Sequence, residues 1–173
     1  MQQLNSEESM RDKTIRLFGQ DSLEICAIGP SDLENLRVWK NAHRQFFFHR
    51  QEIQPVQQQE WYAGYMQRPN DYMFIVKQGG QAIGCMGIRL LEDGWDVYNV
   101  ILGIADFAGR GLMGRALQLI LKFARDRRHR LISLKVLKKN PAIGWYKKNG
   151  FRITADDGDH LIMQHFTEAV TEP

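Results

Sequence analysis

Residues 140–151 read NPAIGWYKKNGF, a run in which an Asn-Pro pair opens a helix and a glycine closes it just before Phe151. Tyr146 lies in the middle of that helix. A second run, GRGLMG at residues 109–114, follows a strand pattern and precedes an amphipathic helix pattern. These two segments, each between a strand and a helix, decide the fold.

The glycine run at 109–114 predicts a phosphate site. Glycines let the backbone approach a ligand closely, and the first N–H groups of a helix attract anions. A turn that needs only positive φ angles is the alternative. The run also matches the G-x-G-x-x-G dinucleotide fingerprint, which requires an acidic residue about 20 positions later. The next predicted strand ends instead in Lys138 and Lys139, which a phosphorylated ribose could tolerate. An antiparallel meander precedes the run, however, and a Rossmann domain does not fit that order.

Outward from these segments, the hydrophobic pattern predicts one α+β domain. Its central sheet is mixed, antiparallel early in the chain and parallel around the last long helix. We expect residues 1–13 to be flexible and residues 14–173 to form the domain. The expected order is a strand at 23–28, a helix opened by the capping-box pattern at 31–34, a helix from 55, strands at 72–77, 82–91 and 95–104, a helix from 112, a strand at 131–137, a helix at 141–149, and strands at 151–154 and 160–166.

Composition narrows the class of protein. The chain has 173 residues, is 43% hydrophobic and carries a formal charge of +3, which fits a single folded domain. No stretch approaches the ~18 apolar residues of a membrane span, and no secretory signal pattern is recognisable. Cys26 and Cys85 match no metal spacing and are expected as two buried, reduced thiols. We therefore expect a cytoplasmic protein that does not interact with membranes.

The two glycine-containing segments together resemble the GNAT superfamily of N-acetyltransferases. Its phosphate motif [Q/R]-x-x-G-x-[G/A] falls on 108–113, and its later motif N-P-A-x-x-x-Y-x-x-x-G-F falls on 140–151. Ala108 replaces the usual Gln or Arg, and Met113 replaces the second small residue, a variation familiar in the ribosomal-protein-acetyltransferase-like (RimJ/RimL-type) branch. The resemblance covers 23–166 in element order. It implies a mostly antiparallel mixed sheet, splayed at the acetyl-CoA site, with helices on both faces.

The resemblance also implies a direct transfer of acetyl from acetyl-CoA to an amine, without an acyl-enzyme. The five His are scattered along the sequence with no metal-ligand spacing, so no metal is expected. Tyr146 would protonate the departing thiolate, unless it is only a core residue. A bulge at Gly103 would splay the sheet. The expected acetyl-CoA contacts are Leu102, Gly103, Ile104, Arg110, Gly111, Leu112, Met113, Gly114 and Asn140, the last of which would alternatively only cap its helix. The general base stays open among Asp96, Glu92, Asp106, His43, His49, Glu60 and a relaying water.

The acceptor side would be built by the first helices. That stretch is similar to the N-terminal half of bacterial acetyltransferases that act on nucleotide-linked amino sugars. Arg37, Arg44 and Arg50 would meet a diphosphate, and Trp39, Phe47 or Trp61 would stack on a base or sugar. The alternative is a plain aromatic core with solvated arginines. A protein N-terminus or an aminoglycoside is the other acceptor considered, although acids are few before Asp71.

Two functions of other classes stay open. Nine Lys and Arg side chains lie between Arg115 and Lys139, against the single acid Asp126. They form either a solvated face or a binding site for a phosphorylated ligand or RNA. Nucleic acid is not the expected partner, because only Phe123 lies near for base stacking. The second open function is that of a CoA-binding sensor that transfers no acetyl group. The expected partner is a small-molecule amine, and the expected state is a monomer or homodimer.

Overall fold

A single eight-stranded sheet organises the protein, in the order β1-β2-β3-β4-β5-β6-β8-β7. The structure is a computed structural model and describes residues 12–167. Every neighbouring pair is antiparallel except β5 with β6, so the predicted mixed, mostly antiparallel sheet is confirmed. The strands are β1 (Arg16–Phe18), β2 (Leu23–Ala27), β3 (Asp71–Gln78), β4 (Gln81–Leu91), β5 (Gly94–Leu102), β6 (Ile132–Leu137), β7 (Phe151–Asp156) and β8 (His160–His165).

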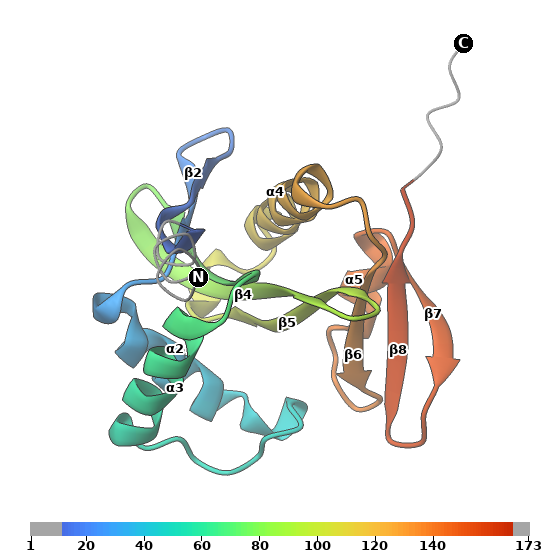
Figure 1. The fold of residues 1–173 in the computed structure, drawn as a ribbon, viewed down its shortest axis with the longest axis horizontal. Helices are drawn as coiled ribbons and strands as arrows, with labels where there is room; N and C mark the ends of the chain where they lie inside the picture. The colour runs from blue at the N-terminus through green and yellow to red at the C-terminus, as the bar shows by residue number, and fades with distance from the viewer. Residues whose placement is uncertain (1–11, 168–173) are drawn as a thin grey trace, which may run out of the picture.

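Helices cover both faces of this sheet, as predicted. α2 (Leu33–Ala42) and α3 (Pro55–Gln67) pack on one face, and α4 (Leu112–Arg127) packs on the other (Figure 1). α5 (Ile143–Lys148) lies beside β6 and β7. Short 3-10 turns complete the described part: η1 (Asp12–Thr14), η2 (Pro30–Asp32), η3 (Arg44–Phe46) and η4 (Ala105–Phe107).

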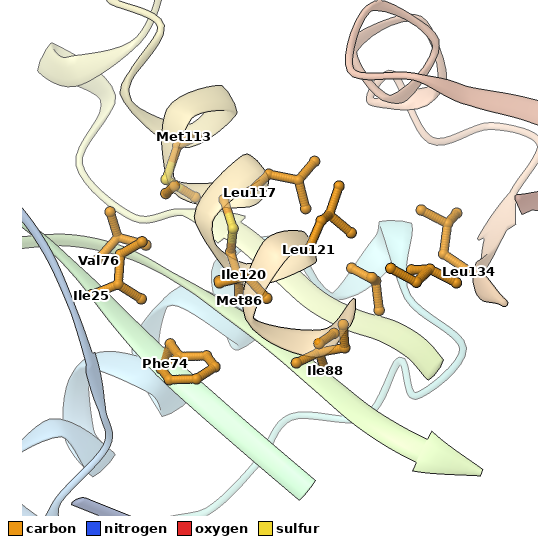
Figure 2. Close-up of a cluster of buried hydrophobic side chains, with 14 of the residues drawn as sticks. Ile25, Phe74, Val76, Met86, Ile88, Met113, Leu117, Ile120, Leu121 and Leu134 are labelled. Atoms are coloured by element: carbon orange, nitrogen blue, oxygen red, sulfur yellow. The ribbon is translucent and has the colours of Figure 1, made fainter. Parts of the chain in front are cut away.

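Alternation along the central strands divides the core between the two faces. In β3, Tyr72, Phe74 and Val76 point to α4, whereas Met73 and Ile75 point to α2 and α3. Each fully buried aliphatic or aromatic side chain stabilises the fold by about 1.5–3 kcal/mol. In Figure 2, α4 presents a row of side chains to Ile25, Phe74, Val76, Met86 and Ile88 of the strands; the row is Met113, Leu117, Ile120 and Leu121.

The parallel pair β5–β6 is the point where the sheet divides. The two strands pair only at Trp95 with Ile132 and at Asp96 with Ser133, and they diverge beyond these positions. The β4–β5 ladder shifts register in the same region, and Asn99 adopts a φ of +48° there. A bulge at Asn99 bends β5 away from β6. The sheet is therefore splayed, with Asp96 at the vertex.

Three local predictions differ from the structure, and a fourth is not tested. β1 was not predicted, because three residues carry too short a pattern. The predicted capping box at 31–34 does not form; the Gly29 N–H instead donates to Asp32 Oδ2 over 2.8 Å and holds the turn η2. β5 ends at Leu102, so the bulge predicted at Gly103 was wrong. The flexibility of 1–13 stays a prediction, because residues 1–11 of that segment lie outside the described residues.

Candidate active site

A cavity of about 530 Å³ lies where β5 and β6 diverge. Its lining includes residues of α2, α3, β4, β5 and β6, together with Tyr146 of α5. On β5 the lining runs without interruption from Asp96, the last residue paired with β6, to Ile101. A volume of this size is typical of sites for small molecules.

The segment between α2 and α3 covers this cavity. Phe46, Phe47 and Phe48 all line it. The carbonyl oxygen of Phe46 accepts a hydrogen bond from Asn140 Nδ2 at 3.4 Å, and the Phe48 ring meets His160 edge-on with 5.3 Å between centroids. These contacts join the covering segment to both the β6–α5 loop and the β7–β8 hairpin.

Tyr146 places a phenol in the cavity wall. The side chain is 7% exposed, and no described residue forms a hydrogen bond with its hydroxyl. Burial raises the pKa of Tyr146 above its usual value, because the phenolate loses hydration. The phenol therefore stays protonated at neutral pH and can donate a proton into the cavity.

Asn140 holds the turn before α5 and lines the cavity, and its contact with pantetheine stays a prediction. Its Oδ1 accepts the Ala142 N–H over 2.9 Å and thus caps the turn that leads into α5. Its Nδ2 points to the covering segment, and the residue lines the cavity.

The glycine run forms an open turn at the start of α4. Gly109 and Gly111 have φ angles of +73° and +71°, and a Cβ at either would meet nothing within 4 Å. The positive φ angles favour glycine at both positions, whereas the packing around them leaves room for a side chain. No side chain caps α4, so its first N–H groups, from Leu112 to Gly114, have no intrahelical acceptor. This arrangement fits a phosphate group.

The predicted pantetheine contacts at 102–104 lie outside the cavity wall. None of the three residues lines the cavity. The N–H groups of Gly103 and Ile104 both donate to Ile83 O, at 2.8 and 3.1 Å. Gly103 lies against Trp39, whose indole occupies the space of a Cβ.

Of the six side chains considered as general base, the cavity brings in Asp96 and His49. Asp96 is 16% exposed and pairs with Arg89, whose Nε lies 2.9 Å from Asp96 Oδ2. Burial raises the pKa of Asp96, and Arg89 opposes that shift. Glu92, Asp106, His43 and Glu60 do not line the cavity.

The acceptor-side predictions divide in the same way. Phe47 and Trp61 line the cavity. Trp39 is buried in the core on the α2 side, and Arg44 lies exposed outside the cavity wall. Arg37 pairs with Glu34 and donates to Ile53 O.

Lys40 and Gln58 also line the cavity, and sequence reasoning missed both. A pattern signal was present for Lys40, which follows the buried Leu36 by one helical turn and so shares its face.

Comparison with known proteins agrees with this geometry. The sequence profile described as "Acetyltransferase (GNAT) family" matches residues 36–151, which include the cavity and both motifs. The chain belongs to the acetyltransferase (GNAT) family. It is thus an N-acetyltransferase of a family that uses acetyl-CoA. No curated protein sequence matches the chain.

Solved structures share the fold at low sequence identity. RimL, a ribosomal L7/L12 α-N-protein acetyltransferase in complex with CoA, is 17% identical, with a TM-score of 0.72 over 87% of this chain and 96% of that one. FdhC, described as a nucleotide-linked sugar GNAT, is 15% identical, with a TM-score of 0.72 over 87% and 89%. A mutant of the SpeG spermidine N-acetyltransferase from Vibrio cholerae is 17% identical, with a TM-score of 0.69 over 83% and 92%.

Two further observations concern the described residues alone. Between 12 and 167, no helix combines the length and the apolar character needed to cross a membrane. The same stretch holds no cluster of three or more His, Cys, Asp or Glu side chains suited to a metal ion.

Proposed function

We propose that this enzyme transfers the acetyl group of acetyl-CoA directly to the primary amine of a small molecule bound in the cavity. The observation that carries the proposal is the cavity at the β5–β6 divergence, where the unpartnered Tyr146 hydroxyl and the Asp96 carboxylate line one space. The proposed subgroup is the ribosomal-protein-acetyltransferase-like branch, supported by the G-R-G-L-M run at 109–113.

Acetyl-CoA would be held from the start of α4 to the cavity. The backbone N–H groups of 110–114 would bind the pyrophosphate, because they are uncapped and the turn is open. The pantetheine arm would pass Asn140 and the end of β5 at 102–104. The backbone edge of β5 that has left β6 would hydrogen-bond the thioester and polarise its carbonyl.

In the transfer, one side chain donates a proton and another accepts one. The neutral amine attacks the acetyl carbon, the C–N bond forms and the C–S bond breaks. Tyr146 gives its phenolic proton to the departing sulfur, and Asp96 accepts the proton that the amine nitrogen loses. Solvent exchange then restores both groups.

An amino-sugar nucleotide is the first acceptor to test. The aromatic rings of Phe47 and Trp61 in the cavity wall offer stacking surfaces for a base or sugar. Polycationic acceptors such as aminoglycosides fit poorly, because Lys40, Arg89 and Lys135 line the cavity against the single carboxylate Asp96.

The test has two stages. A thermal-shift titration compares acetyl-CoA, CoA and NADPH, and only the two CoA compounds should stabilise the protein. Release of the CoA thiol is then measured with amino-sugar nucleotides, simple amino sugars, peptides with free N-termini and aminoglycosides. Binding of CoA without turnover of any amine would identify a sensor instead of an enzyme. Stabilisation by NADPH alone would refute the cofactor assignment.

A further inference from the structure

Lys40 is a half-buried cation that lacks an acidic partner. Its Nζ donates to Asn99 Oδ1 at the β5 bulge and lies 3.4 Å from the centroid of the Phe47 ring. No carboxylate of the described residues forms an ion pair with it. Burial lowers the pKa of Lys40 to about 8. Keeping an ammonium in such a place costs free energy unless a ligand completes its surroundings.

The other charges of the cavity leave this cation uncompensated. Asp96 is the one carboxylate in the lining, and Arg89 already neutralises it. Lys135 of β6 adds a second positive charge at the cavity edge. The cavity therefore carries a positive charge that a bound anion would balance.

Gln58 adds an uncharged polar side chain to the lining of the same cavity. The side chain is 7% exposed and lines the cavity from α3. No described residue forms a hydrogen bond with its amide, whose oxygen and nitrogen are not fully buried and so face open space. Its amide can bond a polar group inside the cavity.

We infer that the acceptor carries an oxyanion, a carboxylate or a phosphate, that binds Lys40, with Gln58 donating a further hydrogen bond. The inference rests on the proposed acetyl transfer and names the class of its acceptor. A charge-assisted bond of this kind strengthens acceptor binding about 10- to 100-fold. The same positive charge disfavours the ammonium form of the acceptor, and acetyl transfer requires the neutral amine.

The experiment compares acceptors that differ only in the anion. Glucosamine is paired with glucosamine 6-phosphate, an α-amino acid amide with the free amino acid, and an amino sugar with its nucleoside-diphosphate derivative. CoA release at saturating acetyl-CoA gives kcat/KM for each. In the wild-type protein, at least one anionic member should exceed its neutral partner about tenfold or more. The phosphate and carboxylate pairs distinguish the two sources of the oxyanion.

Variants then assign the effect to Lys40. Lys40→Met should lower kcat/KM for the anionic member far more than for the neutral member, so that the preference disappears, while acetyl-CoA affinity stays unchanged. Lys40→Arg should retain part of the preference. Gln58→Leu should reduce it, and Lys122→Met, at an exposed lysine paired with Asp126, should change nothing.

Three results would overturn the inference. One is a panel in which neutral or polycationic amines are the better substrates, which would leave the proposed acetyl transfer intact. Another is a Lys40→Met variant that loses activity equally with both members of a pair, because Lys40 would then act on acetyl-CoA or on the fold. The third is failure of every anionic amine to react. If the other amines do react, only the inference is refuted; if all of them also fail, the proposed acetyl transfer is refuted too.

Discussion

Gly103 and Trp39 are in such close contact that a Cβ on Gly103 would lie 2.1 Å from Trp39 Cε2. The contact joins the end of β5 to the buried face of α2, and both N–H groups at 103–104 are bonded to Ile83 O. It fixes the chain just before the turn that leads to α4. The absence of a side chain at Gly103 is therefore a packing requirement.

Gly103→Ala should consequently destabilise the protein. The added methyl has no room, because the indole is itself buried and cannot move without disturbing the α2 core. Overpacking of this kind costs about 1–3 kcal/mol in the free energy of unfolding. Urea unfolding measures it, with Gly144→Ala as the control, since a Cβ there meets nothing within 4 Å. Equal stability of the two variants would show that Trp39 is not held as described.

Gly111→Val should lower the affinity for acetyl-CoA, beyond any effect of the substitution on the stability of the fold. Gly111 has a φ of +71° next to the uncapped start of α4, so valine adds both backbone strain and a side chain at the proposed phosphate site. Gly158→Val is the matched control, because Gly158 has a φ of +83° and open space in the β7–β8 turn, away from α4. Calorimetric titration should show a large loss of affinity in the first variant and none in the second. Similar affinities would move the pyrophosphate elsewhere.

Tyr146→Phe should lower kcat while leaving acetyl-CoA affinity unchanged. The phenol is buried, protonated and without a hydrogen-bond partner among the described residues, so its removal deletes only the proton donor. Loss of a general acid typically costs about 10²–10⁴-fold in rate. Steady-state kinetics is the measurement, and Tyr62→Phe, at a tyrosine outside the cavity lining, is the control. Wild-type turnover in Tyr146→Phe would leave the residue a core role only.

Asp96→Asn tests the proton acceptor. Burial raises the pKa of Asp96, so its carboxylate is the better base and should be protonated, and inactive, at acidic pH. In the wild type, kcat should fall as the pH falls through that pKa. The variant should have a lower kcat at neutral pH, and its kcat should not show this fall at acidic pH. Asp106→Asn, at an exposed site outside the cavity, should retain it. An unchanged pH profile in Asp96→Asn would point to a relaying water or to His49.

The element order could be predicted because it depends on local patterns. The continuous apolar run of β3 and the helical spacing of α4 both lie within single segments, and the motifs at 109–114 and 140–151 are contiguous. Membership of the cavity depends on register instead. Trp39 and Lys40 are neighbours in sequence, but only Lys40 enters the cavity. Similarly, the position of the bulge follows from the pairing of β4 with β5, which no local pattern at Asn99 reveals.

Lys40→Met should stabilise the protein at neutral pH. Burial lowers the pKa of Lys40 in the folded state to about 8, below its usual 10.5, so the folded state disfavours the ammonium. Below pH 8 Lys40 is protonated in both the folded and the unfolded state, and the free-energy cost of burying its charge applies in full. Between pH 8 and 10.5 the unfolded chain binds more protons, and the stability of the wild type rises with pH. Removing the charge should add at most about 3 kcal/mol at pH 7, less the lost bond to Asn99.

Urea unfolding of the wild type and Lys40→Met at pH 7 and pH 10 measures this difference. The advantage of the variant should be present at pH 7 and should shrink at pH 10, whereas Lys122→Met, at an exposed lysine, should show no such pH dependence. A variant that is less stable than the wild type at pH 7 would mean that Asn99 and Phe47 compensate the charge fully. A lysine that lowers stability and whose loss removes the preference for anionic acceptors would be retained for binding, at the expense of the fold.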